Sequence, residues 1–180
     1  MEFARVYLYG KGEENPAMQL GKKVAEMVEK DEEQEDEILE HLRIYLPQYK
    51  HKEYEINTTF NGIKLKGFLD GFEPPPKLVV GEYKTGRLWT QDMADRTEQL
   101  HWYALLVHLA FKIPPEKIRF VLTWMPTEWE VGNIIRPTGD IQNFETKRTT
   151  ADCLKIGKKI IKAHQEIGQF CAKEYASIGL

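Results

Sequence analysis

The chain has 180 residues and a formal net charge of −3, with 42% of its residues hydrophobic and 29% charged. This composition is typical of an ordinary globular protein, and the length suffices for one sizeable core. The mild negative charge argues against a nucleic-acid binder that acts through its overall charge, so any such contact must come from local patches.

The two cysteines, Cys153 and Cys171, follow no metal-binding pattern. Without a Cys-x-x-Cys pair or a Cys/His cluster, zinc and iron–sulfur sites held by cysteine are not expected. A disulfide remains open, although buried free thiols are the favoured interpretation. Since no apolar run approaches the roughly 20 residues that span a bilayer, we expect a cytoplasmic protein with no membrane partner.

The N-terminal part of the chain is expected to be mainly helical after an initial strand or arm of about a dozen residues. Residues 16–46 place apolar side chains at helical intervals, and Asn15 with Pro16 forms a typical helix start. The acidic run DEEQEDE, residues 31–37, is either a solvated helix face or an exposed loop. Pro47 ends the helical pattern.

A hairpin follows, because residues 54–60 and 63–72 flank Asn61-Gly62, a dipeptide suited to a type I′ turn. Alternation in the second strand places four side chains on one face: Lys64, Lys66, Phe68 and Asp70. Three prolines end the hairpin, and residues 77–84 are expected to form a buried strand.

The rest of the chain alternates helices and strands. A helix is expected over residues 92–111, a strand over 118–125 with a pairing segment at 130–137, and a final helix over 149–175. The element order predicts a mixed α/β fold, in which helices flank a central mixed β-sheet within one domain, residues 1–180.

The two strands that follow one another around the prolines both end in charge. Asp70 ends one, and Glu82 and Lys84 end the other, where alternation puts them on the same side. Two carboxylates brought together repel each other, and a divalent cation relieves that repulsion. Asp70 and Glu82 are hard oxygen ligands suited to Mg²⁺ or Mn²⁺, which keep waters able to act as nucleophiles.

Lys84 and Tyr83 complete this arrangement. A lysine beside such a cation can orient the attacking water or neutralise a phosphate, and the backbone carbonyl of Tyr83 is a further candidate ligand. These parts suit hydrolysis of a phosphodiester. The plain alternative is an ordinary surface salt bridge between Glu82 and Lys84.

The segments GFLDGF, VVGEYKTG and EQLHWYALL together resemble the PD-(D/E)xK nuclease superfamily, specifically its RecB-like branch with Cas4-type and phage recombination exonucleases. Asp70, Glu82 and Lys84 match its catalytic core, and Gln99 and Tyr103 match its Q-x-x-x-Y motif in type and spacing. The resemblance covers roughly residues 20 to 125 and implies a restriction-endonuclease-like core. The four cysteines of its iron–sulfur members are absent from this sequence.

Gln99 and Tyr103 also share one helix face, where an amide and a phenol can hold a lysine, a phosphate or a strand end. The alternative is a surface glutamine beside a core tyrosine. The branch often has a metal-binding histidine in its first helix, but Ala25 stands at that spacing here. Some relatives use a glutamate instead, so the resemblance implies Glu26 as a metal ligand, with Glu29 second.

A nucleic-acid groove is predicted from three cationic side chains and one aromatic ring. The cations would contact phosphates, and bases would stack on the ring. Its candidate residues are Lys64, Lys66, Arg87 and Trp89. An ordinary exposed strand face is the alternative for the two lysines. The other tryptophans are expected to be packing residues.

The sequence therefore predicts a metal-dependent deoxyribonuclease, most simply an exonuclease of phage or bacterial recombination, repair or DNA processing. DNA is the expected partner, and a homo-oligomer or a recombination or repair partner protein stays open. One alternative is a catalytically inactive nucleic-acid-binding or assembly module on the same fold, which Ala25 favours. Another is a metal-dependent hydrolase of a small phosphoester.

Overall fold

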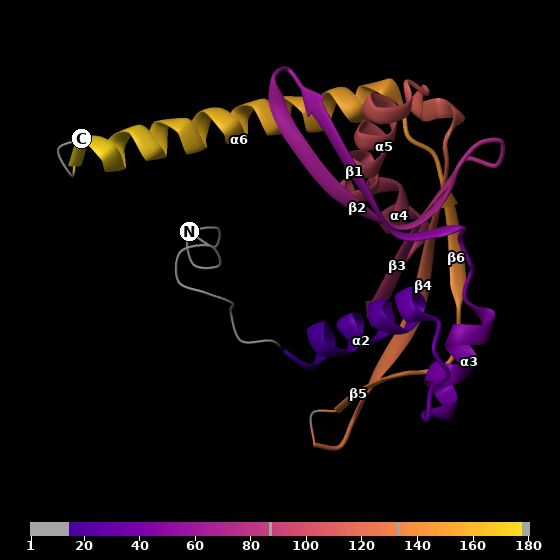
Figure 1. The fold of residues 1–180 in the computed structure, drawn as a ribbon. Coiled ribbons are helices and arrows are strands. Elements are labelled where there is room, and N and C mark those ends of the chain that lie inside the picture. Colours follow the sequence, from indigo (N-terminus) through magenta and orange to yellow (C-terminus); the bar gives the residue numbers. More distant parts are fainter. Residues whose placement is uncertain (1–14, 87, 133, 178–180) are drawn as a thin grey trace. The chain divides into compact units, whose positions relative to one another are not determined.

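The computed structural model describes residues 15–86, 88–132 and 134–177, with side chains up to residue 170 (Figure 1). The helices are α2 (Pro16–Lys30), α3 (Glu37–Tyr45), α4 (Gln91–Arg96), α5 (Glu98–Phe111) and α6 (Thr150–Ser177), with a 3₁₀ turn η1 (Pro115–Lys117). The strands are β1 (His51–Phe60), β2 (Ile63–Glu73), β3 (Val79–Gly86), β4 (Arg119–Glu130), β5 (Ile134–Pro137) and β6 (Gln142–Thr146). The first dozen residues, where a strand or arm was expected, lie outside this description.

The fold is mixed α/β, with helices flanking a central six-stranded mixed sheet, as the sequence predicted. The strand order is β1-β2-β3-β4-β5, and β6 pairs with β4. The β1–β2, β2–β3 and β4–β5 pairs are antiparallel. Within the described ranges, no helix is both long and apolar enough to cross a bilayer.

The described residues form two compact units, and each unit is built from three segments of chain. The first unit contains residues 15–48, 83–90 and 122–144. The second unit contains residues 49–82, 91–121 and 145–177. The single domain expected over residues 1–180 stays a prediction.

The first unit is organised around the apolar faces of α2 and α3. Their buried side chains pack with Met125, and Tyr83, Ile135 and Ile141 lie against this cluster. The helical pattern expected over residues 16–46 is divided into two helices, because Asp31 takes a left-handed conformation (φ 54°) that ends α2. Asp36 then caps α3 by accepting hydrogen bonds from two backbone amides.

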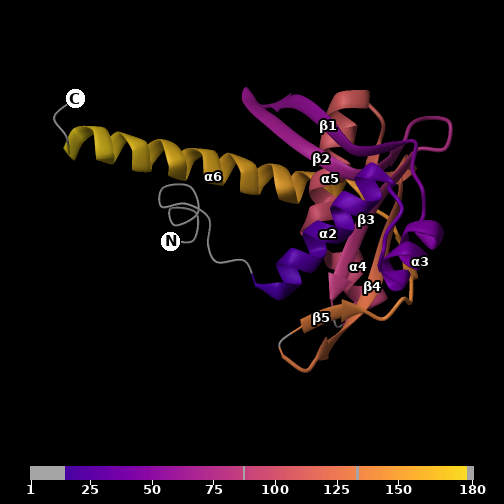
Figure 2. The ribbon, with the colours of Figure 1, turned by 60° about the horizontal axis from the view of Figure 1, so that its bottom comes forward.

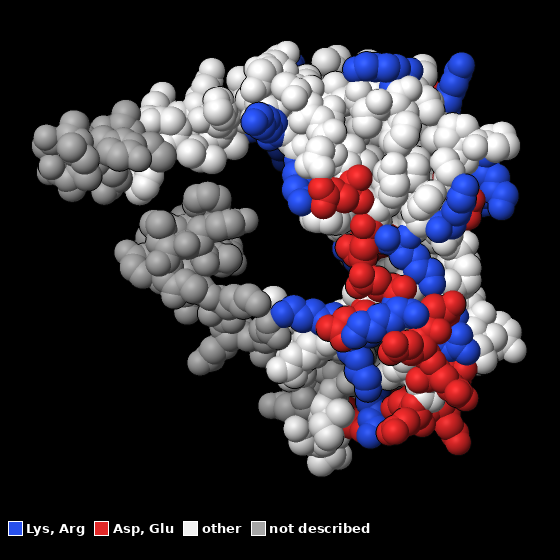
Figure 3. Space-filling view, viewed as in Figure 1, with Lys and Arg blue, Asp and Glu red and all other residues white. Residues whose placement is uncertain are grey.

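The acidic run between these helices is an exposed loop that continues into the start of α3. Figure 3 shows acidic side chains gathered over α3, with basic side chains among them. Arg43 of α3 pairs with Glu40 at 2.7 Å and with Asp31 at 3.0 Å. The exposed-loop interpretation of the run is therefore the correct one.

The second unit is built on the β1–β2 hairpin and α5. Asn61 and Gly62 both have positive φ angles, 47° and 79°, as a type I′ turn requires. α5 contacts β1, β2 and α6, and Figure 2 shows the hairpin beside α5. Gly67 of β2 leaves space for Trp102 and Leu106 of α5. In α6, Cys153 is a buried free thiol, while the side chain of Cys171 lies outside the described residues.

The helix expected over residues 92–111 is broken at Thr97, which has an extended backbone (φ −63°, ψ 124°). Side chains from the C-terminal part of the chain hold the end of α4, a constraint that helical periodicity cannot reveal. β6 was not predicted from the sequence either. This strand is short and polar, and only Phe144 and Thr146 in it are buried.

Tyr49 packs against the sheet where β2 and β3 meet. Gly71 lies opposite Gly81 in their antiparallel register, and a Cβ at either glycine would overlap atoms of the Tyr49 ring. Burial raises the pKa of the Tyr49 hydroxyl to about 12. The two glycines therefore provide the flat surface on which this ring rests.

We expect Gly81→Ala to lower the free energy of unfolding by about 1–3 kcal/mol, because the added methyl group overpacks the Tyr49 ring. Urea unfolding at neutral pH measures the change. Gly168→Ala is the control, since its Cβ would meet nothing within 4 Å and alanine favours helix. If the cost of Gly81→Ala persists in a Tyr49→Ala background, the ring is not its cause.

Candidate active site

Asp70 and Glu82 lie on neighbouring strands beside the glycine pair. Asp70 precedes Gly71 in β2, and Glu82 follows Gly81 in β3. Because Gly71 and Gly81 are register partners, the two acidic residues adjoin the same cross-strand pair. Directly opposed residues of antiparallel strands have Cβ atoms about 4.5–5.5 Å apart. The register thus brings together carboxylates that are separated by a turn and three prolines in the sequence.

Tyr103 of α5 contacts this pair of carboxylates. Its hydroxyl donates a hydrogen bond to Oδ1 of Asp70 at 3.1 Å, and Nε2 of Gln99 donates to the same hydroxyl at 2.9 Å. The two α5 residues are one helical turn apart, so both reach the same place. Gln99, Tyr103 and Asp70 therefore form a continuous hydrogen-bonded chain from α5 to β2.

The environment of Tyr103 is buried and negatively charged. Tyr103 is 4% exposed, and Glu82 is 1% exposed. Burial, followed by the charges of Glu82 and Asp70, raises the pKa of the Tyr103 hydroxyl well above its usual range, against a smaller opposing effect of the Gln99 hydrogen bond. The phenol therefore stays protonated and acts as a hydrogen-bond donor to the carboxylates.

This arrangement is suited to binding a cation. Two carboxylates close together at a mostly buried position repel each other, and a positive charge between them lowers that energy. Their oxygens are ligands of the type that Mg²⁺ and Mn²⁺ prefer. Among the described residues, however, no three His, Cys, Asp or Glu side chains are grouped as a metal site. A cation held here would need backbone oxygens or waters as its other ligands.

Lys84 and Tyr83 follow Glu82 directly in β3 but belong to the first unit. Lys84 is half-buried, and the Tyr83 hydroxyl donates a hydrogen bond to the backbone carbonyl of Pro47. The alternation of a β-strand remains the argument that puts Lys84 and Glu82 on one side. Their roles in catalysis and metal binding stay predictions.

Glu26 lies in α2 of the first unit, where it is exposed and 3.9 Å from Lys30. Glu29 is also exposed. This surface ion pair is the ordinary state of a helix glutamate, with Lys30 one turn later. The assignment of either residue as a metal ligand stays a prediction.

The residues predicted to contact nucleic acid belong to different parts of the chain. In the second unit, Lys64 and Lys66 are exposed on β2, and Lys66 pairs with Glu55 at 2.9 Å and lies over the Phe68 ring. Trp89 is half-buried in the first unit. Arg87 lies outside the described residues. The predicted groove stays a prediction.

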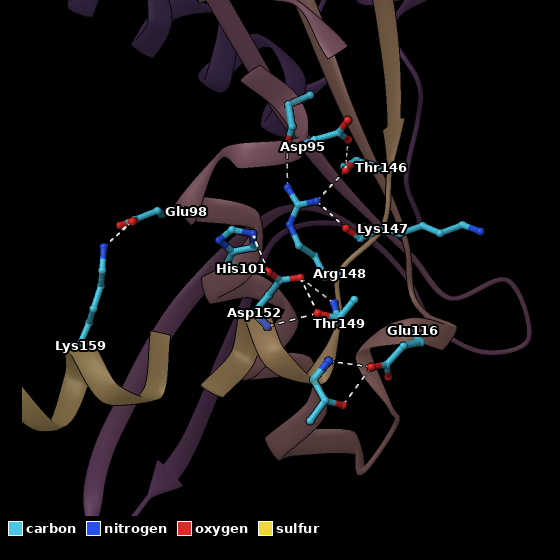
Figure 4. Close-up of polar contacts among 12 residues, drawn as sticks. Asp95, Glu98, His101, Glu116, Thr146, Lys147, Arg148, Thr149, Asp152 and Lys159 are labelled. Atoms are coloured by element: carbon cyan, nitrogen blue, oxygen red, sulfur yellow. Dashed lines mark hydrogen bonds and ion pairs between the residues drawn. The ribbon is translucent and has the colours of Figure 1, made fainter. Parts of the chain in front are cut away.

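A buried polar network in the second unit holds the segment that leads into Gln99 (Figure 4). The guanidinium of Arg148, 1% exposed, donates to the carbonyl of Ala94 at 2.7 Å and to Thr146 at 2.6 Å. Thr146 in turn donates to Asp95 at 2.6 Å. These contacts fix the end of α4 immediately before α5. Arg148 was not predicted from the sequence, because an isolated arginine after a short polar strand carries no recognisable spacing.

His101 is part of the same region. Its Nε2 lies 3.5 Å from Asp152 of α6, and the residue is buried. Burial, and secondarily the charge of Arg148, lowers the pKa of His101. The imidazole is therefore a neutral packing residue at neutral pH.

The structure is similar to a crystal structure from Eubacterium rectale, of a protein provisionally named an exonuclease. The TM-score is 0.54 at 13% sequence identity, and the match covers 91% of this chain and 70% of that one. The two proteins share a fold. No family model and no curated protein matches this chain.

The position of Tyr103 predicts how stability changes at high pH. Its hydroxyl pKa is raised on folding, so its contribution to stability is complete below about pH 10, the unfolded value, and is lost as the pH rises further. We expect Tyr103→Phe to reduce the fall in unfolding free energy above pH 10 by about 1 kcal/mol per pH unit.

Urea unfolding at several pH values between pH 8 and pH 12 would measure this slope. These two limits lie about two pH units below and above the pKa of tyrosine in the unfolded chain. Tyr45→Phe is the control, because Tyr45 is 65% exposed. Equal slopes for wild type and Tyr103→Phe would contradict the buried, carboxylate-facing hydroxyl.

Proposed function

We propose that this protein is a metal-dependent deoxyribonuclease that acts as an exonuclease. The supporting observation is the contact of the Tyr103 hydroxyl with Asp70, next to Glu82, with Gln99 bound to the same hydroxyl. These four residues match the two motifs of the PD-(D/E)xK resemblance. The fold shared with a protein provisionally named an exonuclease agrees with this proposal.

The donor set fits a hard divalent cation, because it offers two adjacent carboxylates and a neighbouring backbone carbonyl. Asp70 and Glu82 would hold Mg²⁺ or Mn²⁺, with the carbonyl of Tyr83 and, from α2, Glu26 as further ligands. Such an ion supplies charge neutralisation at the phosphate and makes a coordinated water more acidic. The protein must supply the remaining steps through its own side chains.

Each residue then has a defined task. Lys84 orients the attacking water and stabilises negative charge that develops on the phosphate. Tyr103 donates its proton to Asp70 in a hydrogen bond and so fixes the direction of that carboxylate. Gln99 holds the Tyr103 hydroxyl in place by donating a hydrogen bond to it from its side-chain amide. Burial around Glu82 lowers the local dielectric and strengthens these interactions.

We expect Lys84→Ala to lower the cleavage rate about 10²–10³-fold while DNA affinity stays within a factor of about three, because one stabilising charge is lost from the transition state. The assay uses end-labelled linear DNA with Mg²⁺, Mn²⁺ or chelator, and circular DNA of the same sequence tests the need for an end. Lys77→Ala, an exposed lysine paired with Glu73, is the control. Normal cleavage by Lys84→Ala would refute its role.

Calorimetric titration with Mn²⁺ tests the ligands without reference to activity. We expect Asp70→Asn and Glu82→Gln each to weaken binding at least about tenfold, because each removes a charged oxygen ligand. Comparison of Glu26→Gln with Glu29→Gln then identifies the α2 ligand, and we expect only the first to weaken binding. Unchanged Mn²⁺ affinity in Asp70→Asn and Glu82→Gln would refute the metal site.

A catalytically inactive nucleic-acid-binding module on the same fold is the second candidate. It is favoured by Ala25 in place of the histidine found in many relatives, and by the lack of a group of three ligand side chains among the described residues. Such a protein would bind DNA, but its calorimetric titration with Mn²⁺ would show no heat of binding that is lost in Asp70→Asn or Glu82→Gln. The same calorimetric titration therefore separates the two candidates.

A further inference from the structure

A row of lysines lies along the solvent side of α6 in the second unit. Lys155, Lys158, Lys159 and Lys162 are all exposed and recur at intervals of three and four residues. Cys153 and Ile156 are buried on the opposite side of the helix. We call these four residues the lysine stripe. Its members are turned away from the face with which α6 packs.

The stripe is uniformly basic. From Cys153 to Gln165 the sequence has no acidic residue, so within α6 the four lysines follow one another over about two helical turns without a carboxylate between them. Lys162 is 77% exposed and lies 3.8 Å from Glu166, one turn further on. Such an exposed pair contributes little energy and can be exchanged for another anion.

One end of the stripe lies beside the first residue of α5. Lys159 pairs with Glu98, the first residue of α5, as Figure 4 shows. Lys159 first, and Lys155 to a lesser degree, lower the pKa of Glu98, so both lysines are close to this carboxylate. Gln99, whose amide is bound to Tyr103, is the next residue. The stripe therefore starts beside the N-terminal turn of α5.

We propose that the lysine stripe binds the phosphate backbone of a DNA duplex and guides it toward the site at Asp70 and Glu82. This inference rests on the proposed nuclease function and adds the surface that holds the substrate. From Lys155 to Lys162 the helix rises about 10 Å. Phosphates on one strand of a duplex recur about every 3.4 Å along its axis, so the stripe spans about three of them.

Glu98 competes with DNA for the stripe in this arrangement. Its carboxylate is 53% exposed and forms an ion pair with Lys159, which a backbone phosphate can replace. A phosphate at that position would also lie at the N-terminus of a helix, where the backbone dipole favours negative charge. Removal of the Glu98 charge should therefore strengthen DNA binding, whereas removal of lysine charges should weaken it.

The test measures binding of full-length protein to a fluorescent DNA duplex over a range of salt concentrations, with chelator present to prevent cleavage. We expect Lys155→Gln/Lys158→Gln/Lys162→Gln to weaken binding about tenfold at low salt and to reduce the salt slope by about two to three. We expect Glu98→Gln to strengthen binding and to raise the slope by about one.

A variant with the same change in net charge is the control. Lys50, Lys77 and Lys112 are exposed lysines of the second unit outside the stripe, and their triple change to glutamine should leave the slope unaltered. Equal losses in the two triple variants would show a net-charge effect and overturn the proposal. The same titration with single-stranded DNA tests the choice of a duplex. If the stripe variant weakens binding of the single strand as much as binding of the duplex, that choice is overturned. Circular dichroism of each variant checks its folding.

Cleavage assays on the same variants separate this inference from the proposed function. If wild type cleaves DNA and the stripe variant binds and cleaves equally well, the stripe proposal alone fails. If wild type binds duplex through the stripe but never cleaves with Mg²⁺ or Mn²⁺, the nuclease function fails while the binding surface stands. If wild type does not bind DNA at low salt, both proposals fail.

Discussion

The candidate site depends on one hydrogen bond, from the Tyr103 hydroxyl to the Asp70 carboxylate. This contact joins α5 to β2 at the position where β3 brings in the nearly inaccessible Glu82. A buried phenol between carboxylates keeps its proton and donates it in a hydrogen bond, because ionisation of the phenol would add a third negative charge. The donor is itself held by the amide of Gln99, so the direction of the Asp70 carboxylate is determined from the helix.

The surrounding scaffold keeps this contact in place through packing on both sides. Gly71 and Gly81 lack the side chains that would displace the Tyr49 ring, and their pairing sets the register in which Asp70 and Glu82 become neighbours. Before the start of α5, Arg148 and Thr146 hold the last turn of α4. A buried guanidinium with backbone and hydroxyl partners resists movement, since loss of any partner leaves a charge unsolvated.

Much of the fold could be predicted from the sequence, because its signals are local. Asn61-Gly62 defined the hairpin, and alternating apolar residues defined β2 and β4. Helical periodicity also predicted α6 to within a few residues. It failed at Thr97, where an extended backbone conformation separates α4 from α5. β6 escaped notice because its pairing with β4, rather than its own hydrophobicity, makes it a strand.

The residues of the candidate site were named from their types and spacing together with the resemblance that these carry. The sequence by itself determined the chemical types of Asp70, Glu82, Gln99 and Tyr103 and the strands and helix on which they lie. Only the tertiary structure decided that a phenol from α5 donates to a carboxylate on β2, and that Arg148 fixes the approach to α5. The physical reason is that spacing along a chain specifies which face a side chain occupies. Contacts between side chains far apart in the sequence depend on the register and packing of whole elements.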